Sequence, residues 1–411
     1  ELRLHYCSLR DGLGDPLSLQ ATVSLRLVDD SLICQLELAG LATQSLPEVF
    51  FPWLGGLGPA ENAESDVITM PSTWQRTVQQ PLRTLPDQRL GWNRSAAKRS
   101  WRYLENLVTA WVDYGGTGRG LALDVRDTSC EPQDIYIERQ WEHTSDGIRA
   151  DSLAMAWVFH PHHGEGNSWR SPEVCVHLHQ GDWHVSARRH RTWALEHFRP
   201  ADTPSCYLSS IGWQFLIMRH EDGQVNWTYD DLPHIARQCV ACGLPNLLIF
   251  GWYEGGHDAL FPEYKPVQAW GGESGLRAAI TQMRADGANP ILYMNPTIWD
   301  CRTEAYQRYG AVWSAKSRAG SEYRESYAWT NTEASTRDRG KSFAVMCPTP
   351  ELNDFTLATV ARIAGYGGPS LHFDQMVRAF CCYDPHHHHV APQRAAIDGY
   401  AQFLPKARQL L

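Results

Sequence analysis

The sequence has 411 residues, of which 43% are hydrophobic and 20% are charged, and its formal net charge is −9. This is the composition of a globular protein that is long enough for two domains. The negative charge and the lack of a long run of Lys or Arg exclude nucleic acid and anionic membranes as expected partners, and no segment approaches the ~20 apolar residues of a membrane span.

Aromatic residues and cysteines are the compositional outliers. The chain has 17 Trp and 16 Tyr, and aromatic rings both fill cores and stack on the apolar faces of sugars, so their number favours a carbohydrate pocket. The eleven cysteines are an odd number, which leaves at least one without a partner in the chain. Cys239 and Cys242 form a single Cys-x-x-Cys pair, which is weak evidence for zinc. The location stays unknown, with the cytoplasm favoured over secretion.

Residues 1–182 alternate between apolar and polar positions, which predicts antiparallel strands. Residues 17–41 form a hairpin pattern with its turn at Asp29–Asp30, and residues 107–127 form another around a glycine-rich turn. His177 and His179 share one strand face and are expected to be a surface pair. The spacing predicts a large β-sandwich, followed by a helix over about 183–197.

From residue 206 onward, short apolar strands alternate with helices, which predicts a parallel sheet that is buried on both faces. The expected strands are 211–218, 246–252, 290–296 and 369–376, and the expected helices are 228–244, 273–288, 352–367 and 391–411. Four such units are half of the eight in a (β/α)8 TIM-type barrel. We therefore expect a β-sandwich domain over 1–182, a linker helix and connector over 183–205, and over 206–411 a barrel domain that is incomplete at its C-terminus.

Carboxylates, histidines and aromatic residues follow the expected strands at their C-terminal ends, where (β/α)8 barrels carry their functional groups. The candidates are Trp252, Glu254, His257 and Asp258 after the second strand, Asn295, Trp299 and Asp300 after the third, and Asp374, Gln375, Asp384, His386 and His387 after the fourth. A polar and aromatic rim of this kind predicts a pocket for a polyhydroxylated ligand.

Four segments of this half carry a family resemblance: FGWYEGGHDALFPEYKP, ILYMNPTIWD, VMCP, and LHFDQM followed by CYDPHHHH. They resemble a glycosidase-type family of unknown function. Its members join an N-terminal β-sandwich to a barrel similar to those of α-galactosidases, α-glucosidases and endo-α-N-acetylgalactosaminidases. The segments WVDYGGTGRGLALDVRD and GDWHVSARRHRTWA resemble the sandwich and linker helix of that family, so the similarity extends over most of the chain.

The resemblance implies that Asp374 is the nucleophile of a retaining α-glycosidase and that His257 and Asp258 line its sugar subsite. Such an enzyme also needs a second carboxyl group, ~5–5.5 Å away, to protonate the leaving oxygen. In the related barrels this acid/base lies on a later strand, and Glu254, Asp300 and Asp384 are poor substitutes for it. We therefore expect a glycoside hydrolase whose acid/base lies on a further polypeptide segment that completes the barrel, and no hydrolysis by these 411 residues alone.

Two other functions stay open. The chain could be a non-catalytic carbohydrate-binding protein, or a metal-dependent hydrolase that uses histidines of the run His386–His389 with Asp374 or Asp384. Four consecutive side chains cannot all face one ion unless the backbone is irregular. We therefore expect no metal and no cofactor, and one or two of these histidines in contact with an oligosaccharide or glycoside substrate.

Overall fold

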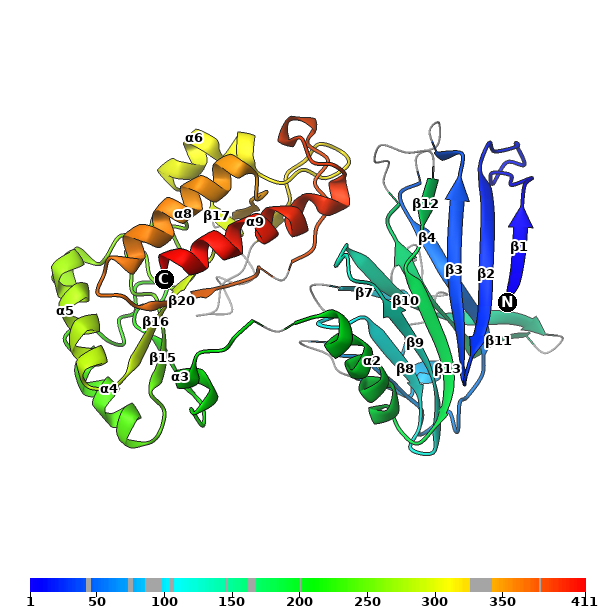
Figure 1. Ribbon diagram of the computed structural model, residues 1–411, viewed down its shortest axis with the longest axis horizontal. Coiled ribbons are helices and arrows are strands. Elements are labelled where there is room, and N and C mark those ends of the chain that lie inside the picture. The colour runs from blue at the N-terminus through cyan, green and yellow to red at the C-terminus, as the bar shows by residue number, and fades with distance from the viewer. Residues whose placement is uncertain are drawn as a thin grey trace. The chain divides into compact units, whose positions relative to one another are not determined.

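A computed structural model describes residues 1–41, 46–72, 77–85, 98–103, 107–144, 147–161, 168–199, 201–325, 342–376 and 378–411. The chain divides into two compact units, Glu1–Pro200 and Ala201–Leu411 (Figure 1). Within the described ranges, no helix combines the length and the apolar character needed to cross a membrane.

The N-terminal unit contains two antiparallel sheets. In the described residues, the larger sheet has the strand order β1-β2-β3-β13-β9-β8-β5-β6 with β12 paired to β3, and the smaller has the order β4-β11-β10-β7. The bounds are β1 (Leu2–Tyr6), β2 (Gln20–Val28), β3 (Ser31–Ala39), β4 (Val49–Leu57), β5 (Val67–Thr69), β6 (Thr77–Gln79), β7 (Lys98–Tyr103), β8 (Trp111–Gly115), β9 (Arg119–Arg126), β10 (Gln133–Thr144), β11 (Gly147–Phe159), β12 (Ser168–Arg170) and β13 (Glu173–Gln180), with the short helix α1 (Pro81–Thr84).

One core joins the two sheets of this unit. Val112 and Leu123 of the larger sheet and Ile135 and Met155 of the smaller one belong to a single cluster of buried side chains. The alternating sequence pattern produces this arrangement because every second side chain of a strand points to the same face. The predicted hairpin of residues 17–41 is confirmed as β2 and β3, and Asp29 adopts the left-handed φ of 52° in its turn.

The helix α2 (His184–His197) packs on β8 and β9 of the larger sheet (Figure 1). Beneath it, Asp113 Oδ2 accepts a hydrogen bond from Ser186 Oγ at 2.6 Å and lies 2.6 Å from His179 Nε2. The expectation that His177 and His179 form a surface pair is wrong, since both side chains are buried. The strand pattern shows that they share a face, but only the packing of α2 covers that face.

The C-terminal unit is built on a parallel sheet with the order β14-β15-β16-β20. These strands are β14 (Trp213–Ile217), β15 (Asn246–Phe250), β16 (Asn289–Met294) and β20 (Ser370–Phe373), and the strands β17 (Ile298–Asp300), β19 (Phe343–Val345) and β18 (Arg324–Glu325) form a small antiparallel sheet. The helices are α3 (Ser205–Leu208), α4 (Leu232–Ala241), α5 (Gly272–Ala285), α6 (Glu304–Trp313), α8 (Pro350–Ala364) and α9 (Ala395–Leu410), with the 3-10 turns η3 (Gln268–Trp270), η4 (Pro385–His387) and η5 (Pro392–Arg394).

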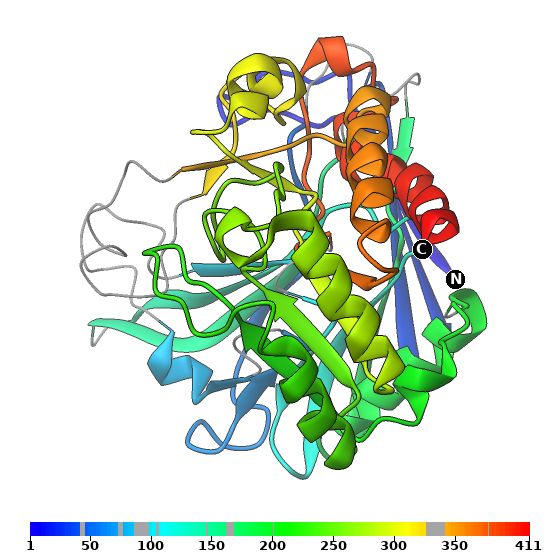
Figure 2. The same cartoon turned by 90° about the vertical axis from the view of Figure 1, so that its left-hand side faces the viewer.

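Helices cover the outer face of this sheet. The helices α4 and α5 pack side by side, α5 contacts β16, and α8 packs on α9. Figure 2 shows α4, α5 and α8 in front of the strands. Fully buried side chains such as Leu247, Leu276 and Leu292 form the core between sheet and helices. The helix starts follow from the sequence: the hydroxyl oxygens of Thr303 and Thr349 cap α6 and α8.

The four parallel strands form an open sheet. Within the described residues β14 and β20 each pair on one side only, so no closed barrel is present in this part of the chain. Four strands are too few to close, because an eight-stranded ring is the size whose interior side chains just fill the centre. Closure into a (β/α)8 barrel therefore stays a prediction.

Candidate active site

Asp374 directly follows β20 at the C-terminal edge of the parallel sheet. Its backbone N–H continues the ladder by donating to Met294 O at 3.0 Å. Its carboxylate accepts two hydrogen bonds: Oδ2 from Tyr293 Oη at 3.0 Å, and Oδ1 from the N–H of Gln375 at 2.8 Å. The side chain is half-buried. Two donors that aim at one carboxylate fix its orientation, and a nucleophile needs a fixed orientation.

Tyr293 is the residue that links this carboxylate to the rest of the edge. Its buried ring stacks on His372 at a centroid distance of 5.9 Å and meets the ring of His257 edge-on at 5.5 Å. Burial, with the nearby charge of Asp374, raises the pKa of Tyr293 well above its usual value. The phenol therefore stays protonated and remains a hydrogen-bond donor to Asp374.

Asn295 and Gln375 organise the backbone on either side of this pair. Asn295 is fully buried, and its Oδ1 accepts from Thr297 N at 3.0 Å and from Thr297 Oγ1 at 2.8 Å, which fixes the turn after β16. Its Nδ2 lies 3.5 Å from Tyr293 Oη. Gln375 has a φ of 60°, and its Oε1 lies 3.4 Å from Thr297 Oγ1. The turns after β16 and β20 are thus joined beside Asp374.

His257 and Asp258 lie on the loop after β15. This loop passes close to the one after β14: a Cβ on Gly256, which has a φ of +83°, would lie 2.5 Å from His220 O, so only glycine fits there. His257 N–H donates to Arg219 O at 2.8 Å, and the His257 ring lies 3.5 Å from Asp258 Oδ2. Asp258 is only 3% exposed.

The charges of Asp258 and Asp374 affect the pKa values of the same buried tyrosines, Tyr264 and Tyr293. Burial raises the pKa of Tyr264 well above its usual value, and the charges of Asp374 and Asp258 raise it further. The same two charges raise the pKa of Tyr293. The two carboxylates, which come from different strand ends, therefore share one electrostatic environment.

Both tryptophans proposed from the sequence are core residues. Trp252 and Trp299 have no exposed surface. Trp252 Nε1 donates to Tyr293 O at 2.9 Å, so its ring supports the strand that carries Tyr293. Trp299 packs against Trp313 and Phe355, with centroid distances of 5.8 and 5.1 Å. Neither ring offers a face for stacking on a sugar.

Glu254 and Asp300 are engaged in local structure. Glu254 Oε1 accepts the N–H of Gln268 at 2.8 Å, and its other oxygen lies 3.7 Å from Arg219 Nη1. Asp300 is fully buried and accepts hydrogen bonds from Arg302 Nε at 2.9 Å and from the N–H of Leu260 at 3.0 Å. Burial alone would raise the pKa of Asp300, but these donors outweigh it and lower the pKa. Both carboxylates serve to fix loops.

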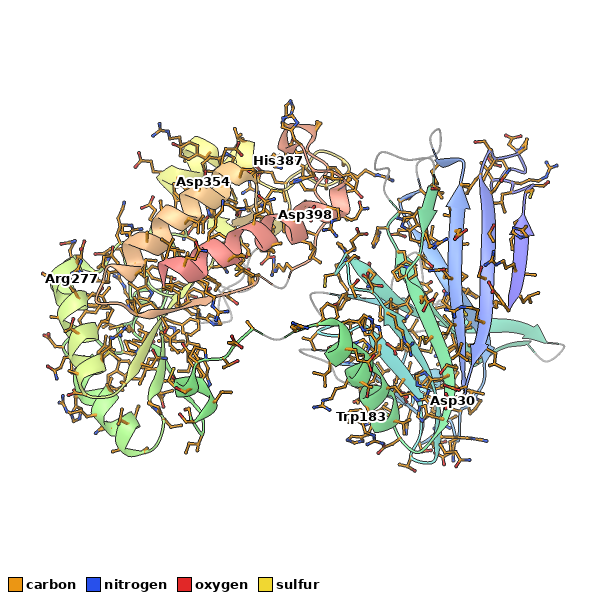
Figure 3. The ribbon with its side chains drawn as sticks, in the orientation of Figure 1. Asp30, Trp183, Arg277, Asp354, His387 and Asp398 are labelled. Carbon is orange, nitrogen blue, oxygen red and sulfur yellow. The ribbon has the colours of Figure 1, made fainter. Side chains whose placement is uncertain are left out.

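Asp384, His386 and His387 belong to a second group, in the segment that follows β20. Asp384 caps η4 by accepting the N–H of His386 at 3.0 Å, and the His386 side chain is exposed. His387 Nδ1 lies 3.3 Å from Cys382 Sγ. His387 and Asp398, which are both labelled in Figure 3, line a pocket of about 470 Å³ together with Trp313 and Glu351.

The sequence pattern assigns no role to Tyr293 or Cys347, and it leaves the adjacent pair Cys381–Cys382 undecided. For Tyr293 a signal exists: it precedes Asn295 by two residues, so both lie on one face of the strand that leads to the site. Cys347 and Cys382 are separated by 34 residues and lie in irregular segments. No period or local motif indicates that they meet.

A comparison with protein families gives one match. The sequence model of the Domain of unknown function (DUF6259) matches residues 170–393, which is more than half of the chain. The chain belongs to this family. None of the curated proteins matches the sequence of this DUF6259 member.

Solved structures of glycosidases resemble this DUF6259 member. The ligand-free α-N-acetylgalactosaminidase NagBb from Bifidobacterium bifidum is 13% identical and has a TM-score of 0.65, with 100% of this chain and 68% of that chain covered. TtGalA, an α-galactosidase from Thermus thermophilus, is 12% identical with a TM-score of 0.52, covering 100% and 69%. The α-galactosidase from Lactobacillus brevis is 10% identical with a TM-score of 0.53, covering 95% and 50%. These likenesses establish a shared fold.

Proposed function

We propose that the chain is the nucleophile-bearing part of a retaining glycoside hydrolase that acts on an α-linked sugar. Asp374 attacks the anomeric carbon and forms the covalent glycosyl intermediate. The observation that carries this proposal is the position of Asp374 at the C-terminal end of the fourth parallel strand, where Tyr293 Oη and the N–H of Gln375 both donate to its carboxylate. A nucleophile needs this combination of an ionised carboxylate, a fixed orientation and partial exposure.

The substrate class follows from the neighbours in fold and from the second carboxylate. The similar structures are α-N-acetylgalactosaminidases and α-galactosidases, one of them in complex with GalNAc, so we assign an α-galactoside or α-N-acetylgalactosaminide as substrate. His257 and Asp258 then bind hydroxyl groups of the sugar next to Asp374. A carboxylate held 3% exposed beside an imidazole suits this role, because hydrogen bonds to a charged acceptor discriminate strongly between sugars.

Several residues that were proposed for substrate contact receive positioning roles. Trp252 supports the backbone of Tyr293, and Asn295 orients the Tyr293 hydroxyl. Gln375 holds Asp374 through its backbone N–H. Glu254, Trp299 and Asp300 shape the loops, and the segment with Asp384, His386 and His387 forms a separate wall.

The general acid is assigned to a further polypeptide segment. Glu254, Asp300 and Asp384 already accept hydrogen bonds that fix local structure. An added strand along β14 would also bury surface that is now open: Trp213 and Phe215 are 52% and 51% exposed on this edge strand. Burial of large aromatic side chains of this kind is a main source of association energy.

The test follows the release of 4-nitrophenol from 4-nitrophenyl α-galactoside and α-N-acetylgalactosaminide. This leaving group needs little protonation, so its release requires the nucleophile but not the acid that we do not expect in these 411 residues. Turnover is counted as this release, because the missing group is also the base that would hydrolyse the glycosyl intermediate. In Asp374→Asn we expect turnover to fall to the uncatalysed rate while calorimetric binding of galactose or GalNAc persists. Asp354→Asn, an exposed acid on α8, is the matched control and should keep full turnover. Unchanged turnover in Asp374→Asn contradicts the proposal. Sugar binding without any turnover by the unaltered chain favours the non-catalytic alternative.

A further inference from the structure

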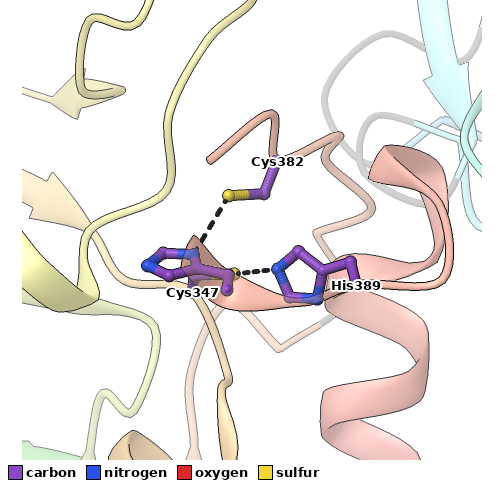
Figure 4. A group of neighbouring side chains, drawn as sticks. Cys347, Cys382 and His389 are labelled. Atoms are coloured by element: carbon purple, nitrogen blue, oxygen red, sulfur yellow. Dashed lines mark hydrogen bonds between the residues drawn. The ribbon is translucent and has the colours of Figure 1, made fainter. Parts of the chain in front are cut away.

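Two cysteines and two histidines converge where the chain after β19 meets the segment that follows β20. They are Cys347, Cys382, His387 and His389, and one ligand atom of each lies within 4.8 Å of all the others. Cys347 Sγ is 3.0 Å from His389 Nε2, and Cys382 Sγ is 3.3 Å from His387 Nδ1 (Figure 4). We propose that these four side chains form a structural Zn²⁺ site. This proposal is independent of the glycosidase assignment.

The distances are close to those of a tetrahedral zinc centre. Zn²⁺ binds sulfur at about 2.3 Å and imidazole nitrogen at about 2.0–2.1 Å, so neighbouring ligand atoms in a tetrahedron are about 3.3–3.8 Å apart. A sulfur and a nitrogen ligand of such a centre are about 3.6 Å apart, and the observed sulfur–nitrogen distances of 3.0 and 3.3 Å are shorter than this. Small outward shifts would admit the ion. The Cys2His2 set is one that zinc prefers over Mg²⁺ or Ca²⁺.

The backbone conformation of the histidine run lets two of its four side chains face the same point. His388 adopts a left-handed conformation with φ 52° and ψ 34°. This reversal lets His387 and His389 turn to the same side, while the side chains of His386 and His388 remain exposed. Only two of the four histidines are thus directed at the cysteines.

The surroundings of His387 fix which nitrogen is free to bind a metal. Its Nε2 lies 2.7 Å from Val312 O. A carbonyl oxygen can only accept, so Nε2 must carry the proton, and in the neutral ring Nδ1 then presents its lone pair to the cluster. Zinc-binding histidines commonly donate their second N–H to a backbone carbonyl in this way.

The cysteines also have the surroundings of zinc ligands. Cys347 and Cys382 are 0% and 2% exposed. The backbone N–H of Lys316 donates to Cys382 Sγ at 3.5 Å, a contact that stabilises a thiolate. Binding of Zn²⁺ by two thiols releases two protons, and the two thiolates then balance the charge of the ion.

Four protein ligands make a closed site, which indicates a structural and not a hydrolytic role. A catalytic zinc keeps one position for water, and this set leaves none. The ion would fasten the end of β19 to the segment after β20. Within that segment, Cys382 N–H donates to Pro392 O at 2.9 Å. The wall of the 470 Å³ pocket that contains His387 and His389 would thereby be held in place.

The test measures zinc in the full 411-residue chain, purified without a histidine tag, without chelators and under reducing conditions. We expect one zinc per chain by elemental analysis and native mass spectrometry. Cys382→Ala and His389→Ala should lose the metal, whereas the matched controls Cys381→Ala and His388→Asn, one residue away, should keep it, since asparagine tolerates the left-handed conformation of position 388.

A second measurement keeps the proposal falsifiable if the first two variants fail to fold. The unaltered protein is stripped of metal and titrated with Co²⁺, which in a tetrahedral thiolate site gives intense visible absorption. One equivalent of Co²⁺ with this absorption supports the site. The zinc proposal is overturned if folded, reduced protein takes up neither Zn²⁺ nor Co²⁺. A Cys347–Cys382 disulfide in freshly purified protein would also overturn it, and so would equal zinc content in all four variants.

Discussion

The Tyr293 hydroxyl donates a 3.0 Å hydrogen bond to Asp374 Oδ2 and thereby joins the third parallel strand to the carboxylate at the end of the fourth. Because Tyr293 is buried between His257 and His372, its hydroxyl cannot turn to water. The geometry of Asp374 is therefore set by the core of the sheet. In this account the nucleophile is positioned before any substrate arrives.

Removing this hydrogen bond should slow catalysis with little effect on folding. A hydrogen bond to a charged group contributes about 1.5–3 kcal/mol, so Tyr293→Phe should lower the turnover of a 4-nitrophenyl α-glycoside by about ten- to a hundred-fold. Tyr400→Phe is the control, since Tyr400 is also buried and its hydroxyl has no partner among the described residues. Equal rates in Tyr293→Phe and the unaltered protein would show that the contact has no part in catalysis.

Asp258 is expected to contribute to sugar affinity. Its φ of 55° is one that Asn tolerates, so Asp258→Asn removes the charge without straining the backbone. We expect the Kd for the sugar, measured by calorimetry, to rise about ten- to a hundred-fold. Asp222→Asn, in the exposed turn after β14, should leave the Kd unchanged. The same Kd in both variants would exclude Asp258 from the subsite.

Asp300 should matter for stability and not for sugar binding. Its buried carboxylate pairs with the half-exposed Arg302, so Asp300→Asn should lower the free energy of unfolding by about 1–3 kcal/mol. The control Asp286→Asn breaks the more exposed pair with Arg237 and should cost less than about 1 kcal/mol. Denaturant titration measures both. A lost sugar affinity with unchanged stability would place Asp300 in the site instead.

The N-terminal unit should lose stability in mild acid through His177. Burial and the charge of Arg189 lower the pKa of His177 from 6.5 to about 4. Below about pH 6.5 the unfolded chain binds a proton at His177 that the folded chain does not bind. The free energy of unfolding therefore decreases as the pH is lowered, by about 2 kcal/mol from about pH 7 to about pH 5.

His177→Gln tests this pH dependence, because glutamine cannot take up the proton. Its stability should fall less steeply over the same pH range than that of the unaltered protein. His184→Gln replaces an exposed histidine of α2 and serves as the control, with a slope like that of the unaltered protein. A slope in His177→Gln that matches the control would contradict the assignment.

The hydrophobic periodicity and the turn residues of the sequence were sufficient to predict the parallel sheet. The expected strands 211–218, 246–252, 290–296 and 369–376 contain β14, β15, β20 and nearly all of β16, and Gly287 follows α5 with a φ of +85°. The position of Asp374 at a strand end followed from the same pattern. These features are local, because the alternation of apolar residues and the turn residues lie within each segment.

Side-chain direction beyond a strand end could not be predicted in this way. Trp252 and Trp299 come from segments that follow expected strands and contain polar residues, yet tertiary packing turns both rings into the core. The partner of Asp300, Arg302, is close in sequence, but only the fold shows that this carboxylate is buried. The convergence of Cys347 with His389 depends on the left-handed conformation of one residue, His388, which no sequence period indicates.

Covalent capture of the nucleophile tests directly whether Asp374 attacks the sugar. The protein is incubated with 5-fluoro-α-galactosyl fluoride, whose fluoride leaves without an acid catalyst and whose ring fluorine slows hydrolysis of the intermediate, and the labelled peptide is sequenced by mass spectrometry. We expect one glycosyl group esterified to Asp374 and no label in Asp374→Asn. A label on another carboxylate, with Asp374 unmodified, would contradict it.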